Sequence, residues 1–562
     1  MKKILGLGIV LLLLYATLLT AIPTSAVSAG PYNSSDPCIK AITIKTTKSL
    51  ASSKATYYKA IVNSSQHGLN KNYRNHTMHV AIGTKNTKLF VYSAESADKM
   101  SYSKKSVLDL VNDFEKENPD WQVIAAINGD FFNKSTGEPE MPMIQNYQML
   151  KSYLLPDSAA RGRGLVGISE ATGKVVYFTQ GTVYREENYG IPYKFDGSYQ
   201  VQVLDSNNLA PKASYGSTLA TTPSAATVSF TTSDYGQGAY AGKTVYVVKL
   251  SRYRKDLGQK NDSGNQNTYY FAEGTITGTV TGTNGMKPKK GEAYIAVTSE
   301  SQAPLLKVGA VVRCQKQLMW EWKNVSNAIG FKQQILVEGN LMFKNAYSRL
   351  HTGDGASKLA TEKWTEDMND YPHCYKARTA IGFKEDGTFI LMTAEYTRPN
   401  ISATYYELSC QFKALGCTNA FLLDGGGSSA MVIREGDKLV TVHHAENGND
   451  GEGRSIANIA IMAVLKDGKT SKFPTANMND DGTPDTIKKT TAKKTTSKTT
   501  SKKDADEDVA EEEIIETTAE SETVADTESG CGGTIAFPAI LATGAVTSAG
   551  FCRRRKDKRN KK

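Results

Sequence analysis

The sequence predicts an α+β fold: a mixed-sheet core with helices and an inserted β-rich subdomain, followed by a disordered stalk and a C-terminal membrane segment. Residues 75–170 and 377–468 combine alternating or continuous apolar runs, which are typical of strands, with two helical patterns. Residues 190–325 contain short Val-, Tyr- and Thr-rich runs between Gly, Asn and Ser clusters, which favour a β-rich insertion. At 562 residues, the chain is long enough for two or more units.

The N-terminus has the pattern of an export signal. Two lysines precede the apolar run 4–19, and small-residue sites ending at Ala26 and Ala29 follow. This arrangement predicts a signal peptide over residues 1–29, with an uncleaved membrane anchor as the alternative. Residues 30–74 are then an N-terminal extension that leads into the main domain.

The main domain, residues 75–468, begins with expected strands at 79–82 and 88–92. Apolar residues at helical spacing predict helices at 103–118 and at 404–415. Further strands are expected at 121–127, 244–248, 275–280, 293–297, 419–423 and 455–465, together with a hairpin over 377–395 that turns at Asp386 and Gly387.

The C-terminal part has three segments of different composition. Residues 469–533 form a linker rich in lysine and then in acidic residues, which cannot bury enough apolar surface to order and is expected to be disordered. Residues 534–552 carry no charge and are long enough to cross a bilayer, and the basic tail 553–562 would keep that end in the cytoplasm. We therefore expect an exported protein anchored at the cell surface, or a secreted one if this tail is a sorting sequence that is processed.

The charge and the cysteines exclude two classes of protein. Most of the formal net charge of +10 comes from the signal lysines and the basic tail, so it does not indicate nucleic-acid binding. The seven cysteines are widely scattered and form no CxxC pair, which argues against a zinc site. An exported chain could form one or two disulfides from them, with partners that the sequence does not identify.

The stretch FLLDGGGSSAMV, residues 421–432, places a carboxylate at the end of an apolar strand. Asp424 is followed by three glycines, 425–427, and by Ser428 and Ser429. Glycines let a ligand approach the backbone, and their N–H groups together with the serine hydroxyls can cradle an anion. The pattern therefore favours an oxyanion-rich substrate such as a phosphate or a sugar. The alternative is a tight turn or bulge with a capping aspartate.

A second polar cluster also follows an apolar strand. Asn128, Gly129 and Asp130 end the run 121–127, and Phe131 comes next, where its ring could face a sugar. An Asn-Gly pair alone would more often be a simple turn. If both clusters serve one function, they must lie in one pocket.

The two clusters together resemble the phosphodiester glycosidase family. The similarity is carried by AINGDFFN (126–133) and LGCTNAFLLDGGGSSAMV (415–432), and it covers roughly residues 75–468. NAIG (327–330), LVEG (336–339), RTAIG (378–382) and GRSIAN (453–458) agree in order. Relatives often carry Asp-Gly-Arg after the hairpin, where this chain has EYTR (395–398), so the role of that loop is open.

The resemblance implies hydrolysis of the bond between the anomeric carbon of a sugar and a phosphate. Such a reaction needs a carboxylate near the anomeric carbon, for which Asp424 is the first candidate and Asp130 the second. Arg378 and Arg454 are the candidates for neutralising the phosphate, because guanidinium groups pair with it through two parallel hydrogen bonds. The expected substrate-binding residues are Asn128, Gly129, Phe131, Gly425, Gly426, Gly427, Ser428 and Ser429.

No cofactor is indicated by a motif, although Asp130 and Asp424 are candidate ligands for calcium or magnesium, which prefer oxygen. The leading interpretation is a surface-tethered hydrolase that acts on a sugar-1-phosphodiester of an envelope or extracellular glycan. One alternative is a non-catalytic glycan-binding or adhesive module. The other is a glycosidase with a leaving group other than phosphate.

Overall fold

The computed structural model describes residues 30–33, 39–65, 73–152, 163–179, 198–207, 209–218, 223–224, 228–234, 237–260, 266–341, 376–396, 402–403, 405–445 and 453–470. All of them lie in the first of two compact units, Met1–Lys488 and Lys489–Lys562. The expected signal peptide (1–29), membrane segment (534–552), basic tail (553–562) and nearly all of the linker (469–533) lie outside the described residues. Within the described ranges, neither helix is long and apolar enough to cross a membrane.

The expected α+β class is wrong, because the described residues are mostly β-strands. This part of the chain contains two α-helices, α2 (Val107–Glu117) and α5 (Tyr405–Ala414), and three short 3₁₀ turns. The expectation assumed that helices alternate with the strands of one mixed sheet. Instead, both large core sheets are antiparallel at every pairing, and hairpins or loops make most connections between described strands.

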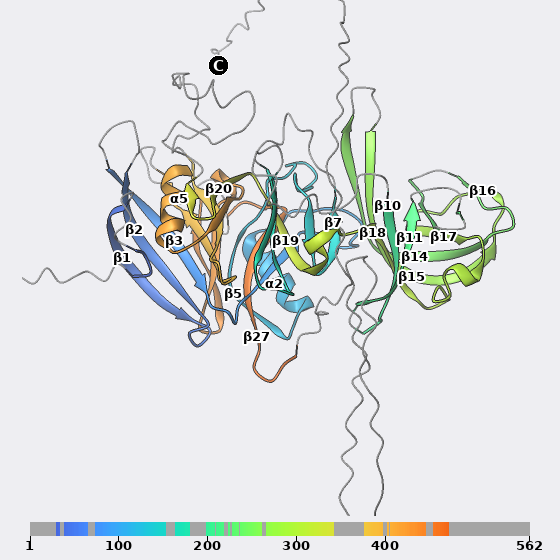
Figure 1. Ribbon diagram of the computed structural model, residues 1–562, viewed down its shortest axis with the longest axis horizontal. Coiled ribbons are helices and arrows are strands. Elements are labelled where there is room, and N and C mark those ends of the chain that lie inside the picture. Colours follow the sequence, from blue (N-terminus) through green and yellow to red (C-terminus); the bar gives the residue numbers. More distant parts are fainter. Residues whose placement is uncertain are drawn as a thin grey trace, which may run out of the picture. The chain divides into compact units, whose positions relative to one another are not determined.

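The core consists of two antiparallel sheets (Figure 1). The eight-stranded sheet has the order β1 (Ile39–Leu50), β2 (Ala55–Ser65), β3 (Tyr73–Gly83), β23 (Phe389–Ala394), β22 (Arg378–Phe383), β24 (Asn419–Leu422), β20 (Gln333–Val337) and β21 (Asn340–Leu341). The five-stranded sheet has the order β26 (Lys438–His444), β25 (Ala430–Glu435), β5 (Trp121–Asn128), β27 (Asn458–Leu465) and β4 (Lys88–Ser93). Strands β1 and β2 come from the stretch expected as an N-terminal extension.

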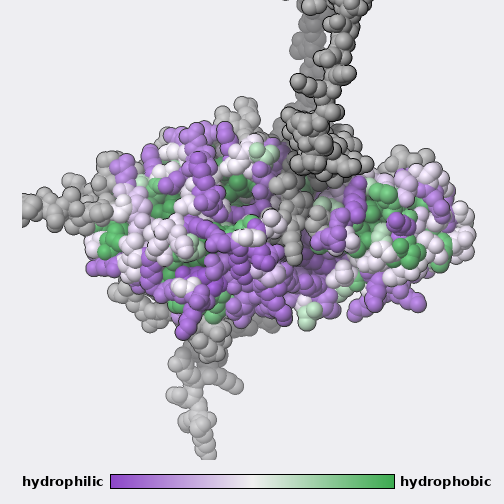
Figure 2. All heavy atoms as spheres, turned by 90° about the horizontal axis from the view of Figure 1, so that it is seen from below, coloured by the Kyte–Doolittle hydropathy of each residue, from purple (hydrophilic) through white to green (hydrophobic). Residues whose placement is uncertain are grey.

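Apolar side chains of the two sheets pack against each other in one core. Ile381 and Phe421 of the larger sheet share this core with Ala125, Ile127 and Met431 of the smaller one. Because successive strand residues point to opposite faces, the outer faces are also apolar and need cover. Figure 2 shows that hydrophilic side chains predominate on one face of the molecule, as burial of these strands requires.

One helix covers the outer face of each sheet. Leu408 and Phe412 of α5 pack on the eight-stranded sheet. Leu110 and Phe114 of α2 pack on the five-stranded sheet. The start of α2 is fixed by Ser106, whose hydroxyl oxygen accepts a hydrogen bond from the Asp109 amide at 3.1 Å. The result is a two-sheet core between two helices.

The β-rich insertion forms a closed barrel in the order β10 (Ser198–Leu204), β11 (Pro211–Thr218), β12 (Val228–Thr232), β17 (Glu292–Val297), β14 (Thr244–Lys260), β15 (Gln266–Thr281) and β18 (Val311–Lys316). A further sheet has the order β7 (Gln148–Lys151), β6 (Met143–Gln145), β19 (Val325–Phe331), β8 (Gly164–Ser169) and β9 (Val175–Thr179), and β13 (Gly238–Ala239) pairs with β16 (Asn284–Met286). Because the barrel is closed, the backbone N–H and C=O groups of its first and last strands pair with neighbouring strands.

Polar contacts join the barrel to the rest of the unit. Asp256 of β14 accepts hydrogen bonds from the Tyr102 hydroxyl at 2.7 Å and the Ser152 amide at 2.9 Å. Arg252 and Arg254 of the same strand both pair with Glu95. These groups are largely buried. The two arginines and Glu95 therefore have to neutralise one another where the barrel contacts the rest of the unit.

Most individual elements agree with the sequence. The expected strands at 121–127, 293–297, 419–423 and 455–465, the helices at 103–118 and 404–415, and the 377–395 hairpin are confirmed to within a few residues. The strands expected at 244–248 and 275–280 exist, but they are parts of the much longer strands β14 and β15. No disulfide joins Cys314, Cys410 and Cys417, which are all buried.

Candidate active site

The two polar clusters of the sequence, at 128–130 and 424–429, form two glycine-containing bends that are in direct contact. The backbone N–H of Asp424 donates to the carbonyl oxygen of Gly129 at 2.9 Å. The side-chain amide of Asn128 donates to the carbonyl oxygen of Asp424 at 2.7 Å. A Cβ on Gly129 would lie 2.1 Å from Asn458 Oδ1, so only glycine allows this close approach. The two bends therefore meet, although Asn128, Gly129 and Asp130 are not part of the pocket wall described below.

Asn128 holds the structure together instead of facing a ligand. Its side chain is fully buried. Its Oδ1 accepts from the Thr379 hydroxyl at 2.7 Å and from the Ala430 amide at 3.1 Å, while its Nδ2 is used on Asp424. With these bonds the amide joins three strand ends, so we assign it to positioning Asp424.

Asp130, the last residue of the 128–130 bend, is buried. Its Oδ2 accepts from the Met141 amide at 2.7 Å, and its own N–H donates to Asn458 Oδ1 at 2.8 Å. Oδ1 is buried and has no hydrogen-bond partner among the described residues. Burial raises the pKa of Asp130 to about 7, against the opposing effect of the Met141 amide. At neutral pH, Asp130 is therefore present in comparable amounts as the protonated acid and as the carboxylate.

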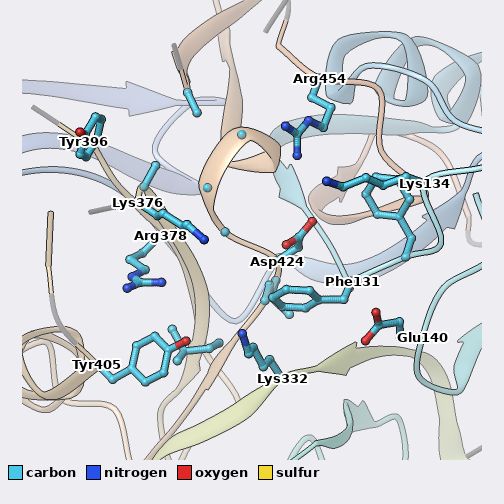
Figure 3. Close-up of a pocket in the computed structure, with 18 residues that line it drawn as sticks. Phe131, Lys134, Glu140, Lys332, Lys376, Arg378, Tyr396, Tyr405, Asp424 and Arg454 are labelled. Carbon is cyan, nitrogen blue, oxygen red and sulfur yellow. The ribbon is translucent and has the colours of Figure 1, made fainter. Parts of the chain in front are cut away.

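Above the bends is a pocket of about 650 Å³ (Figure 3). Asp424 lies at its centre, and Phe131 lies next to it (Figure 3). Its described wall consists of Phe131, Phe132, Lys134, Glu140, Lys332, Lys376, Ala377, Arg378, Tyr396, Tyr405, Leu422, Leu423, Asp424, Gly425, Gly426, Gly427, Ala445 and Arg454. Of the expected site residues, this wall contains Asp424, Phe131, both arginines and the three glycines, but not Asn128, Gly129, Asp130, Ser428 or Ser429.

Asp424 is a partly exposed carboxylate with a perturbed pKa. Desolvation raises its pKa to about 6, while the nearby Ser428 hydroxyl, the Gly425 amide and the cations Arg454 and Lys332 act in the opposite direction. At neutral pH the Asp424 carboxyl is mostly ionised, and it lies in the pocket wall, where a substrate would bind.

The glycine loop, residues 425–427, lacks side chains and so leaves space for neighbouring residues. Some of its backbone amides bind carbonyl oxygens of the protein and are not directed at a ligand. The amides of Gly426 and Ser428 donate to the carbonyl oxygens of Ala377 and Gly425. Gly426 has φ +61°, which other residues rarely adopt. A Cβ on Gly427 would lie 2.5 Å from a guanidinium nitrogen of Arg454, so this glycine lets Arg454 reach the pocket.

Arg378 is the first residue of β22 and is 7% exposed. Its guanidinium lies 4.9 Å from the ring centre of Tyr405, and its Nε donates to the Ala403 carbonyl at 3.4 Å. Ser429 lies deeper, with its Oγ 3.0 Å from Thr379 Oγ1. Ser428 and Ser429 are both buried, so Ser428 affects the pocket through Asp424.

Three lysines of the pocket were not expected from the sequence. Lys134, Lys332 and Lys376 bring the cationic side chains of the described wall to five, against the carboxylates of Asp424 and Glu140. Glu140 already pairs with Arg163. Lys332 lies 4.7 Å from the ring centre of Phe131. No local sequence pattern could have found these lysines, because the packing of distant strands brings them to the pocket.

The described residues do not fit the candidate metal site. Asn128 and one oxygen of Asp130 are committed to backbone groups, and five cationic side chains surround Asp424. Within the residues that the structure describes, no group of three or more His, Cys, Asp or Glu side chains is arranged to hold a metal. A divalent cation would meet like charge here, which is unfavourable.

Residues 265–463 match the model of a family described as phosphodiester glycosidase. Among known proteins, the chain is 35% identical over 97 residues to the SPbeta prophage-derived uncharacterized protein YomE of Bacillus subtilis (strain 168). That match covers 17% of this chain and only 14% of the relative.

Two solved structures are similar at low identity. A hypothetical protein from Synechocystis is 14% identical with a TM-score of 0.37, over 75% of this chain and 64% of that chain. The catalytic domain of zebrafish N-acetylglucosamine-1-phosphodiester alpha-N-acetylglucosaminidase, auto-inhibited by its pro-peptide, is 10% identical with a TM-score of 0.33, over 78% and 98%.

The segment that matches the family contains Arg378, Asp424 and Arg454, whereas the bend at 128–130 precedes it. This match suggests glycosidase activity and a sugar-containing substrate. The resemblance of this chain to the phosphodiester glycosidase family is therefore confirmed over residues 265–463.

Proposed function

We propose that this pocket hydrolyses the bond between the anomeric carbon of a sugar and the phosphate of a phosphodiester. The observation that carries the proposal is one ionisable carboxylate, Asp424, at the centre of a pocket whose described wall has five cationic side chains. A neutral glycan would not need such a wall. A phosphodiester supplies the negative charge that these side chains would neutralise.

Asp424 is the group best placed to act on the anomeric carbon. The transition state of glycoside hydrolysis resembles an oxocarbenium ion, which a carboxylate stabilises as a nucleophile or as a base for water. Over the reaction, the bond from the anomeric carbon to the phosphate oxygen breaks, and water supplies a hydroxyl to carbon. The phosphate leaves as a monoester, and the proton of water passes to a base or to solvent.

The cations would assist departure of the phosphate. A phosphate monoester is a good leaving group, so neutralising its charge matters more than protonating it. Arg454 is held close to the glycine loop, and Lys332 lies near Asp424 across the Phe131 ring. Phe131 and Tyr396 are half-buried and offer aromatic surface on which a sugar ring can pack.

The physiological substrate would be an envelope or extracellular glycan that contains sugar-1-phosphodiester bonds. This part of the proposal rests on the export signal expected over residues 1–29. Export stays a prediction, and comparing the N-terminus of the mature protein with the encoded sequence would test it.

The reaction is tested with three substrates that share one sugar or one phosphate. The purified protein is given a glycosyl-1-phosphodiester, the same sugar with a neutral leaving group, and a phosphodiester without sugar. We expect reducing sugar to be released from the first substrate alone. Turnover of the neutral glycoside at an equal rate would favour a glycosidase with another leaving group, and binding of the first substrate without turnover would favour a glycan-binding module.

A further inference from the structure

We propose that Glu140 selects the sugar of the substrate by accepting a hydrogen bond from one of its free hydroxyl groups, on the part of the sugar ring away from the scissile bond. This inference rests on the proposed function and specifies the substrate of that site. It follows from where Glu140 is fixed relative to Asp424 and from what a carboxylate can accept.

Glu140 and Asp424 are anchored to the same bend of the chain. The backbone N–H of Glu140 donates to the carbonyl oxygen of Phe131 at 2.7 Å. The backbone N–H of Asp424 donates to the carbonyl oxygen of Gly129 at 2.9 Å. Gly129 and Phe131 are two positions apart, so their Cα atoms lie within about 7 Å of each other. Although Glu140 and Asp424 are far apart in the sequence, one short bend therefore fixes the backbone of both.

The segment that carries Glu140 is also held by the residues around it. The amide of the next residue, Met141, donates to Asp130 Oδ2 at 2.7 Å. A β-bridge between Phe132 and Pro139 closes the loop that leads back to Glu140. The buried Asp130, which is not part of the described pocket wall, thus helps to position Glu140. A side chain on so fixed a backbone has a defined position, which selection between similar ligands requires.

The Glu140 side chain lines the pocket and has the capacity to bind a ligand. It belongs to the described wall, and its side chain is 34% exposed. Arg163 pairs with Oε2 of Glu140, and the same guanidinium lies 5.9 Å from the ring centre of Phe131. The two oxygens of a carboxylate together accept about four hydrogen bonds, so this ion pair orients Glu140 without using all of its acceptor positions. Because a carboxylate donates no hydrogen bond, the ligand has to supply the donor.

Glu140 lies on the side of Asp424 where the sugar is expected. In Figure 3, Arg454 lies on one side of the Asp424 carboxylate, and Phe131 and Glu140 lie on the other. A Cβ on Gly427 would lie 2.5 Å from Arg454 Nη2, so the glycine loop leaves room for this guanidinium beside Asp424. Guanidinium groups pair well with phosphate, and the scissile phosphate is bonded to the carbon on which Asp424 acts. With the phosphate beside Arg454, the sugar ring extends past Phe131 towards Glu140.

Hydroxyl groups are the donors that this part of a sugar offers. In a six-membered sugar ring, the hydroxyls on C3, C4 and C6 are the ones away from the anomeric carbon. A hydrogen bond from one of them to a carboxylate is stronger than a bond between two neutral groups. A sugar that lacks the hydroxyl, or that uses it in a further linkage, leaves Glu140 without its donor, which is costly in a partly enclosed site. The preferred substrate is therefore a sugar in which this hydroxyl is free.

The test uses four substrates with the same scissile phosphodiester and leaving group. The parent is the glycosyl-1-phosphodiester that the purified protein cleaves fastest, and the others are its 3-, 4- and 6-deoxy forms. We expect kcat/KM to be lower by about tenfold or more for one deoxy form, which identifies the hydroxyl. In Glu140→Ala, this deoxy form and the parent should react at nearly equal rates, because the partner of the hydroxyl is gone. Glu140→Gln keeps the size of the side chain and one acceptor oxygen, so it should retain part of the preference.

Glu435→Ala is the matched control. Glu435 is also ion-paired, with Lys48, and its side chain is 33% exposed, but it lies outside the described pocket wall. This variant should keep the full preference for the parent sugar. Because each preference is a ratio measured within one variant, a general loss of activity in Glu140→Ala does not affect the comparison.

Turnover of all four substrates within about threefold of one another overturns the role of Glu140 while leaving the proposed reaction intact. The same conclusion follows if a preference exists but Glu140→Ala retains it, as a purely structural role of Glu140 would require. If the purified protein cleaves no glycosyl-1-phosphodiester, the proposed function and this inference both fail.

Discussion

The backbone N–H of Asp424 donates to the carbonyl oxygen of Gly129 at 2.9 Å, so the ends of β24 and β5 are joined by a direct hydrogen bond. These residues are 295 positions apart in the sequence, and they belong to different sheets of the core. The bond fixes the backbone of Asp424 to a residue outside the described pocket wall. The candidate catalytic carboxylate therefore stands on the junction of the two sheets, which is a rigid place for it.

Replacement of Asn128 by alanine should impair both stability and activity. The change leaves the Asp424 carbonyl, the Thr379 hydroxyl and the Ala430 amide without their buried partner. We expect the free energy of unfolding to fall by about 3 kcal/mol or more, since each unsatisfied buried group costs ~1–3 kcal/mol. Chemical denaturation measures the effect, with the exposed turn residue Asn86→Ala as control. An equal, small loss in both variants would contradict the assigned role of Asn128.

Gly427→Ala should lower activity without lowering stability. The new methyl group displaces the guanidinium of Arg454, which is the flexible end of a side chain, and the backbone of Gly427 accepts alanine. We expect kcat/KM to fall by about 10–100-fold with an almost unchanged melting temperature. In an Arg454→Ala background the same change should have little further effect. Additive losses in the double variant would show that Gly427 acts independently of Arg454.

The activity should decline in acid as Asp424 takes up a proton. Its pKa is about 6, and the reaction requires the carboxylate, so kcat/KM should fall as the pH drops below about 6. Arg454 favours the ionised form, so Arg454→Met should raise this pKa and move the acidic limb to higher pH. The pH profile of the residual activity measures the shift. A limb that stays in place or moves to lower pH would assign the titration to another group.

Asp130 should make the protein less stable as the pH rises. Its folded pKa of about 7 lies above the ordinary value of 3.8, so between these values the folded state holds a proton that the unfolded state has lost. Its contribution is therefore favourable at low pH and is lost as the pH increases to about 7.

Asp130→Asn keeps an acceptor for the Met141 amide and removes the titration. At each pH we compare the free energy of unfolding of this variant with that of the unmodified protein by urea denaturation. We expect this comparison to favour the variant more at pH 8 than at pH 4. A stability difference that does not change with pH would show that Asp130 does not titrate in this range.

Local sequence patterns predicted the elements and the two bends well. The apolar spacing of Val107, Leu110 and Phe114 identifies α2, because periodicity is a property of nearby residues. Asp424 could be located for the same reason: a carboxylate between an apolar strand and three glycines is unusual in itself.

The class of the fold and half of the site depend on contacts between distant segments. A single lysine such as Lys332 or Lys376 has no local pattern that distinguishes it from a surface lysine, and only the packing of β19 and β22 brings them to Asp424. Asn128 and Asp130 lie at or just after the end of a strand, as Asp424 does, yet they are buried and do not line the pocket. The α+β expectation failed because strand pairing, which determines the class, was not visible in the periodicity.

The central claim is that Asp424 is the group on which cleavage of a sugar-1-phosphodiester depends. The most direct measurement is the rate of reducing-sugar release by Asp424→Asn, with Asp437→Asn, an exposed carboxylate in the turn between β25 and β26, as the matched control. We predict a loss of about 10³-fold or more in Asp424→Asn alone, with an unchanged melting temperature. Release within about threefold of the unmodified rate in Asp424→Asn would contradict the account.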